Sequence, residues 1–224
     1  MDRISPRLLA ITLGTLASLA PALQPAQAQA TSRICSEQAG EAPGPACLAA
    51  HQDLGALPQG PLYWRIYTFA DAQAAERAKS VRGAVVQAFA RVWLFEVGEK
   101  GRDPEGGQHL ADVGPLPIEP TTGDFSAEYL KSTFLPGASA PVHVHSGPEA
   151  FYAISGASCL ETPDGVQVAR GAGHSLMVRR GPPMLLMAIG QETRQGFALI
   201  LHGEGSRPTS LTSDWTPKGL CPED

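Results

Sequence analysis

Two histidines and a glutamate stand close together in the stretch 141–156, PVHVHSGPEAFYAISG. His143 and His145 are two residues apart, so on a β-strand their side chains point to the same face. Glu149 follows a Ser-Gly-Pro corner and begins the next apolar segment. Two imidazoles and one carboxylate that converge from adjacent strands are a ligand set for non-haem iron and related divalent ions. The stretch therefore predicts a metal site, and the alternative is a pair of ordinary histidines on a solvent-exposed strand edge.

The residues around this stretch have the pattern of an all-β domain. From Ser126 to His202, apolar segments of strand length alternate with turn-forming sequences such as PGAS, SGP, PDG and GAG. Many short strands with close turns are typical of a sandwich or barrel rather than of alternating βα units. The sequence TPDG at 162–165 predicts a hairpin between two of these strands.

Residues 31–125 have a different texture, and we interpret them as an N-terminal extension. Within it, 61–97 predicts a strand–helix–strand unit: a strand in LYWRIYTF, a helix with Asp71 as its N-cap, and one long strand in AVVQAFARVWLFEV. A further short helix is expected at 46–57. The predicted organisation is thus an extension at 31–125, a barrel at 126–205 and a C-terminal tail at 206–224.

The spacing of the candidate ligands resembles the first motif of the cupin superfamily at every position. That motif has a glycine, two histidines, a glutamate and a second glycine at set intervals, here Gly137, His143, His145, Glu149 and Gly156. The resemblance covers roughly residues 126–202, about the length of one small cupin barrel.

The second cupin motif is matched only in part. Gly173 and Gly181 keep its frame, whereas Arg179 stands where the family has a proline and Met184 where it has a histidine. The resemblance implies a mainly β fold, a double-stranded β-helix (jelly-roll) barrel carrying an N-terminal α/β extension. It also implies a small-molecule or metal site in the mouth of the barrel.

Carried over by residue, the resemblance keeps His143, His145 and Glu149 as metal ligands and places Met184 at the fourth-ligand position. Three readings stay open. Three ligands suffice for iron, manganese or zinc with open positions for water or substrate; ligation by the Met184 sulfur would favour copper; or the barrel has lost its metal.

Strand alternation from Glu149 predicts which neighbours line the same interior. Phe151, Ala153 and Ser155 are expected to line a pocket with the ligands, while the residues between them pack on the other side. Such a lining favours a weakly polar small molecule, and the alternative is that these side chains only fill a small barrel core.

The other histidines, His51, His109, His174 and His202, are interpreted as ordinary side chains. His202, at the end of the last strand, is the one that could serve as a replacement ligand.

Residues 1–30 have the organisation of a secretory signal peptide: a basic start, an apolar run and two overlapping Ala-x-Ala signatures. Cleavage is expected after Ala28 or Ala30, with Ala30 preferred. The alternative is an uncleaved anchor, but Pro21 interrupts the apolar run, which is shorter than the about 20 residues of a comfortable span.

The four cysteines, Cys35, Cys47, Cys159 and Cys221, all follow this segment. An even number of cysteines in an exported chain predicts disulfides, and no C-x₂-C pair indicates zinc. Of the three pairings, we favour Cys35 with Cys47, across a short loop, and Cys159 with Cys221, which would tie the tail to the body. A periplasmic or secreted protein is the predicted outcome.

The composition argues against nucleic acid and anionic membrane surfaces as partners. The chain has 17 basic and 22 acidic side chains, a net charge of −5, and no basic run. We therefore expect a small-molecule ligand and no membrane contact after signal cleavage. A homodimer is a further expectation that the sequence leaves open, since cupin barrels often pair through strand edges.

The predicted function is an exported cupin-domain protein that holds a divalent metal and binds or transforms a small organic molecule. As an enzyme, it could be a metal-dependent oxygenase, isomerase or lyase, because one barrel hosts many chemistries. The alternative is a non-catalytic, metal-free module for small-molecule binding or structure.

Overall fold

The computed structural model describes residues 33–35, 44–119 and 122–223, so the predicted signal peptide lies outside the described residues. The elements follow in the order β1 (Arg33–Ile34), β2 (Gly44–Gly55), β3 (Tyr63–Phe69), α1 (Ala72–Ala78), β4 (Gly83–Ala88), β5 (Arg91–Gly98), β6 (Gln108–Val113), β7 (Phe125–Phe134), β8 (His143–His145), β9 (Glu149–Ser155), β10 (Ala157–Thr162), β11 (Gly165–Arg170), β12 (Ser175–Val178), β13 (Leu185–Ile189), β14 (Arg194–Gly203) and β15 (Thr209–Leu211). The mainly β fold class is confirmed. In this part of the chain, no helix is long and apolar enough to cross a bilayer.

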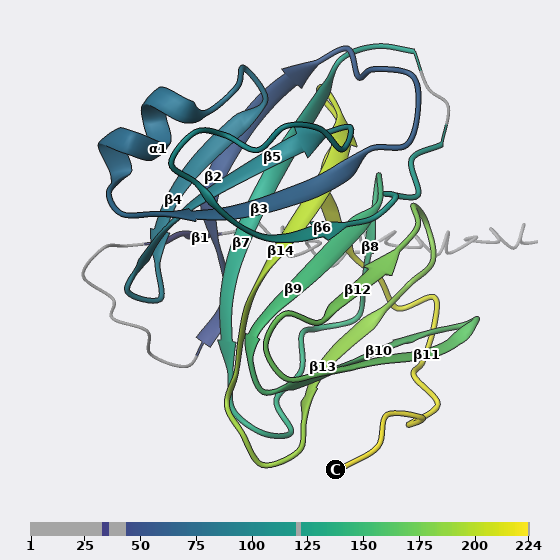
Figure 1. The fold of residues 1–224 in the computed structure, drawn as a ribbon. Coiled ribbons are helices and arrows are strands. Elements are labelled where there is room, and N and C mark those ends of the chain that lie inside the picture. Colours follow the sequence, from purple (N-terminus) through teal and green to yellow (C-terminus); the bar gives the residue numbers. More distant parts are fainter. Residues whose placement is uncertain (1–32, 36–43, 120–121, 224) are drawn as a thin grey trace, which may run out of the picture.

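A six-stranded sheet in the order β1-β2-β7-β14-β9-β12 forms the centre of the molecule (Figure 1). A four-stranded sheet, β4-β5-β3-β6, packs on one of its faces through the larger apolar core, to which Trp64, Phe95, Tyr129 and Phe197 contribute. A three-stranded sheet, β11-β10-β13, covers the opposite face. The central sheet is therefore buried on both sides.

The central strands send alternate residues to these two cores. On β7, Tyr129 packs in the core shared with the four-stranded sheet, and Leu130 packs in the core shared with the three-stranded sheet. The second of these cores is called the barrel interior below; it also contains Phe151 and Ile200. Burial on both faces explains why the middle of β14, residues 197–201, is a continuous apolar run.

The expected helix at 46–57 is wrong, because this segment is β2, a strand paired antiparallel with β7. Alanine is the strongest helix former, but tertiary context overrides intrinsic propensity, and the edge of β7 offers this segment a row of backbone partners. Ala46 and Leu48 reach the barrel interior by ordinary strand alternation, and a register shift between Leu48 and Ala50 lets both Ala49 and Ala50 pack in the other core. The extension thus supplies a strand to the central sheet.

The long strand expected at 84–97 is also wrong, because the chain turns back at Phe89 and Ala90 to form the hairpin β4–β5. Both residues have positive φ, 51° and 55°, as a tight two-residue hairpin turn requires. Neither glycine nor asparagine marks this turn in the sequence. Packing stabilises it: the Phe89 ring meets Phe197 edge-on at 5.2 Å, and Trp93 Nε1 donates to the Ala88 carbonyl.

Two local predictions are confirmed. Asp71 caps α1, with its carboxylate accepting from the Ala74 amide at 2.7 Å. The TPDG sequence turns β10 back into β11, where Thr162 pairs with Gly165.

Both disulfides form as favoured, Cys35 with Cys47 and Cys159 with Cys221. The second attaches the C-terminal tail to β10. On the same strand, the fully buried Glu161 carboxylate accepts hydrogen bonds from the backbone amides of Lys218 and Leu220. The tail is therefore fixed both covalently and by a buried acceptor.

Candidate metal centre

His143 and His145 lie on the short strand β8, with both side chains on one face as their spacing predicts. Their rings are 4.7 Å apart and nearly perpendicular. Strand β8 pairs with β15, and His143 also exchanges two backbone hydrogen bonds with Met184, which lies directly opposite. Glu149 begins β9 beyond the Ser-Gly-Pro corner. Three chain segments therefore fix the positions of these side chains.

The three candidate ligands come together in the structure. One potential ligand atom from each of His143, His145 and Glu149 lies within 4.8 Å of the other two. The residues are only 9%, 4% and 3% exposed, respectively. A solvent-exposed strand edge, the alternative for this histidine pair, is thus excluded.

Backbone carbonyls orient both imidazoles. His143 Nδ1 lies 2.7 Å from the Pro141 carbonyl oxygen, and His145 Nδ1 lies 3.1 Å from that of Pro208. A carbonyl oxygen can only accept, so each Nδ1 carries the hydrogen and each neutral ring presents the lone pair of Nε2. This is the arrangement that protein metal sites use to orient histidine ligands.

The second nitrogen of His145 faces the carboxylate at short range. Nε2 lies 2.9 Å from Glu149 Oε2, and the two buried atoms are close but not aligned as a hydrogen bond. With a neutral imidazole, two acceptors would face each other away from water, which is unfavourable. A cation between them, or a proton on His145, relieves this contact. The donor set therefore fits a divalent ion.

The pKa directions of the two histidines differ. Burial is the largest effect on His143 and lowers its pKa, with the neighbouring His145 acting in the same direction and Glu149 opposing. Burial also lowers the pKa of His145, but the charge and proximity of Glu149 outweigh it, so this pKa is raised. The lowered pKa keeps His143 in the neutral form that binds metals. At His145, the negative charge of Glu149 favours a positive charge, either a proton on the ring or a bound cation.

Met184 is fully buried and packs in the barrel interior with Phe151, Leu160 and Leu186. Because it is paired with His143 across the two strands, its side chain lies on the same face of the sheet. The apolar neighbours are those of a packing residue, and its role as a ligand stays a prediction.

The alternation predicted for β9 is confirmed at its first positions. Phe151 packs in the barrel interior, whereas Tyr152 and Ile154 pack in the other core. Ala153 is buried, and the Ser155 hydroxyl donates to the Thr193 carbonyl. That Phe151, Ala153 and Ser155 line a ligand pocket stays a prediction.

Arg194 is a buried charge that the sequence did not single out. It is 1% exposed, and its guanidinium donates to the hydroxyls of Ser158 and Ser132 and lies over the Phe134 ring. Burial lowers its pKa to about 10, and the charge of Glu149 opposes that shift. No carboxylate of the described residues forms an ion pair with it. The barrel thus contains a buried arginine. The sequence pattern did not predict its burial, because Arg194 directly follows a polar turn.

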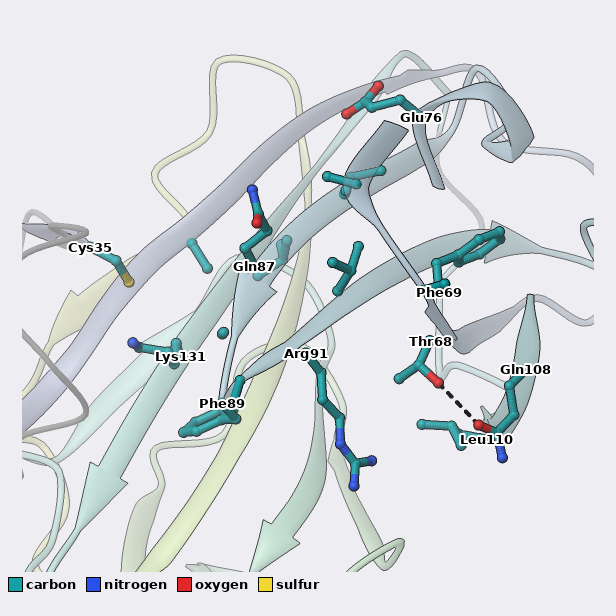
Figure 2. A pocket seen from close by; sticks show the side chains of 18 residues that line it. Cys35, Thr68, Phe69, Glu76, Gln87, Phe89, Arg91, Gln108, Leu110 and Lys131 are labelled. Atoms are coloured by element: carbon teal, nitrogen blue, oxygen red, sulfur yellow. Dashed lines mark hydrogen bonds between the residues drawn. The ribbon is translucent and has the colours of Figure 1, made fainter. Parts of the chain in front are cut away.

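A separate surface groove of about 960 Å³ lies between the four-stranded sheet and strands β2 and β7 (Figure 2). Thr68 and Gln108 form a hydrogen bond along its wall, and Lys131 lies over the Phe89 ring. Glu76 is the one carboxylate among its lining residues, and none of the three candidate ligands contributes. The groove is therefore not part of the candidate metal centre.

No protein-family model matches the chain, and no curated protein matches it. The solved structures that match include a cupin superfamily protein from Desulfitobacterium hafniense (13% identity, TM-score 0.31). The matched region covers 34% of this chain and 67% of that protein's chain. The match to a cupin-like protein from Thermotoga maritima (14% identity, TM-score 0.35) covers 38% of this chain and 64% of that chain. The match to an oxalate oxidase (17% identity, TM-score 0.34) covers 38% of this chain and 46% of that chain.

The proteins from Desulfitobacterium hafniense and Thermotoga maritima are described as cupin or cupin-like, and the third is described only as an oxalate oxidase. The chain spans only about half to two thirds of their length. At these identities and TM-scores the likeness carries no information on the activity of this chain.

Proposed function

We propose that the cupin domain of this chain binds a divalent metal ion on His143, His145 and Glu149 and, in an exported protein, binds or transforms a small organic molecule at that ion. The observation that carries the proposal is the buried contact between His145 Nε2 and Glu149 Oε2 at 2.9 Å. Both histidines donate through Nδ1 to carbonyl oxygens, so their Nε2 atoms are free to coordinate. A buried carboxylate without such a cation must bind a proton or find another donor.

The residues divide the work of such a site. His143 and His145 supply neutral nitrogen donors of fixed orientation, and Glu149 supplies the negative charge that offsets part of the charge of the ion. When bound, the ion would supply Lewis acidity or a site for activating oxygen. Iron, manganese and zinc all suit two imidazoles and one carboxylate, and ligation by the Met184 sulfur would favour copper.

The two disulfides support export to an oxidising compartment. Two disulfides form in the described part of the chain, and such bonds persist outside the cytoplasm. Together with the signal-peptide pattern of residues 1–30, this supports a periplasmic or secreted protein.

Replacing His143 by alanine tests the proposal. We expect His143→Ala to weaken zinc or manganese binding at this site at least about hundredfold, because two remaining ligands rarely hold a divalent ion. Elemental analysis of the purified protein and calorimetric titration measure the loss. The matched control is His174→Ala, since His174 is exposed and lies outside the group. Equal, weak binding by the wild type and His143→Ala would contradict the proposal and favour the metal-free binding module.

Met184→His provides a gain of function at the same site. The new imidazole would lie opposite His143 and restore the fourth ligand of the family pattern, so we expect zinc or manganese to bind at least about tenfold more tightly. Competition with a chelator measures the affinity. Met184→Leu, which keeps the volume, serves as control: unchanged affinity indicates a packing role for Met184, and weakened copper binding indicates sulfur ligation. No gain in Met184→His would indicate that the side chains cannot converge on one ion.

A further inference from the structure

A second group of potential ligands lies on the central sheet, on three adjacent strands: His51 on β2, Glu128 on β7 and His202 on β14. One potential ligand atom from each lies within 4.8 Å of the other two. His51 is directly opposite Glu128 in the strand register, and His202 is two residues beyond Ile200, which is opposite Glu128 on the other side. We propose that these three side chains bind a second divalent cation. The inference goes beyond the function proposed above and does not depend on it.

The second group faces the same interior as the first. Glu128 is two residues from Leu130, and His202 is two residues from Ile200; both apolar residues pack in the barrel interior. Ile200 pairs with Glu128 on one side and with Glu149 on the other. The two glutamates therefore stand in one row of the sheet, two strand spacings apart, or roughly 10 Å between Cα atoms. A second cation here would be a near neighbour of the first.

Two buried atoms of the group have no hydrogen-bond partner. His202 is 6% exposed, and its Nδ1 lies 3.1 Å from the Gly203 carbonyl, so a neutral ring presents the Nε2 lone pair. That Nε2 and Glu128 Oε2 are both buried and unpartnered. Two orphaned acceptors side by side are costly, and a cation satisfies both at once. A buried water, with two hydrogens to donate, is the competing occupant.

The third ligand gives the group a route to solvent. The His51 side chain is 45% exposed, and Asp53 holds its ring through a contact of 3.0 Å to Nε2. Asp53 is itself fixed by the Ser126 hydroxyl. A carboxylate that orients an imidazole is a common supporting element of metal sites. Two imidazoles and one carboxylate suit zinc, cobalt, iron or nickel rather than calcium or magnesium.

A matched pair of substitutions separates the two sites. Glu128→Gln and Glu149→Gln each remove one charge at nearly constant shape, and zinc stoichiometry is measured by titration followed by elemental analysis. We expect two equivalents in the wild type, one in each single variant and none in the double variant. Circular dichroism and thermal unfolding check that each variant is folded.

The exposed ligand gives a second readout that does not risk the fold. His51→Ala is expected to weaken the second zinc at least about tenfold and to leave the first unchanged, with the exposed His174→Ala as control. Zinc binding that is the same in the wild type, Glu128→Gln and His51→Ala would overturn the proposal and assign the space to water. If instead zinc is lost in Glu128→Gln but kept in Glu149→Gln, the second site stands and the function proposed for the first site fails.

Discussion

Gly147→Ala is expected to destabilise the folded protein by more than about 3 kcal/mol. A β-carbon at this position would lie 1.7 Å from the carbonyl oxygen of Leu201 and 2.8 Å from its carbonyl carbon. Leu201 belongs to β14, in the middle of the central sheet, and its amide donates to the Pro148 carbonyl, so this backbone cannot move aside cheaply. Because Gly147 lies between His145 and Glu149, any shift that relieves the clash also separates the candidate ligands. Urea denaturation measures the change in stability, and zinc titration measures the effect on the site.

Gly137→Ala is the matched control, because it tests a different reason for glycine. Gly137 has a φ of +77° and nothing within 4 Å of an added β-carbon. The cost there is only that of holding alanine in the left-handed region, about 1–2 kcal/mol. Gly147 has no such positive φ, so equal losses in the two variants would contradict the account based on the close approach of Leu201.

Loss of the Cys159–Cys221 disulfide is expected to destabilise the protein by about 4 kcal/mol in the chain-entropy model. The two cysteines are 62 residues apart, so the bond removes much of the freedom of the unfolded chain. Cys159 is fully buried beside Ala157 and Ile189, and the double variant Cys159→Ala/Cys221→Ala keeps that position apolar. Denaturant titration under oxidising conditions measures the loss.

Cys35→Ala/Cys47→Ala provides the comparison, since those cysteines are only 12 residues apart. The same model gives about 3 kcal/mol for this shorter loop. A larger loss from the short loop than from the long one would contradict the entropic account. It would instead point to contacts made by one of the two segments.

The strands of the barrel could be predicted from the sequence because their signals are local. Residues 126–202 combine apolar segments with turn residues at each reversal, as at TPDG. The hairpin at Phe89 and Ala90 could not be predicted, because its positive φ angles rest on the packing of Phe89 against Phe197 rather than on a turn residue. Strand β2 could not be predicted either, because what makes it a strand is the edge of β7, 70 or more residues away.

The same distinction separates the two groups of ligands. His143, His145 and Glu149 lie within seven residues, so strand alternation and one corner bring them together. His51, Glu128 and His202 come from three distant segments, and only the register of the sheet places them side by side. The local sequence around His51 or around His202 does not by itself indicate a metal ligand. Their possible role comes into view only with the pairing of the strands.

The pairing of β2 with β7 also has a consequence for the incompletely folded chain. Strand β2 is synthesised well before β7, and β7 in turn pairs with β14, about 70 residues further on. Contacts between such distant segments form slowly, because a long loop must close before any of them is gained. Strands β2 and β14 pair with opposite edges of β7, so until β14 arrives one edge of β7 is open to other chains while β2 can cover the other. We therefore expect the extension to leave only one edge of β7 exposed in an incompletely folded chain.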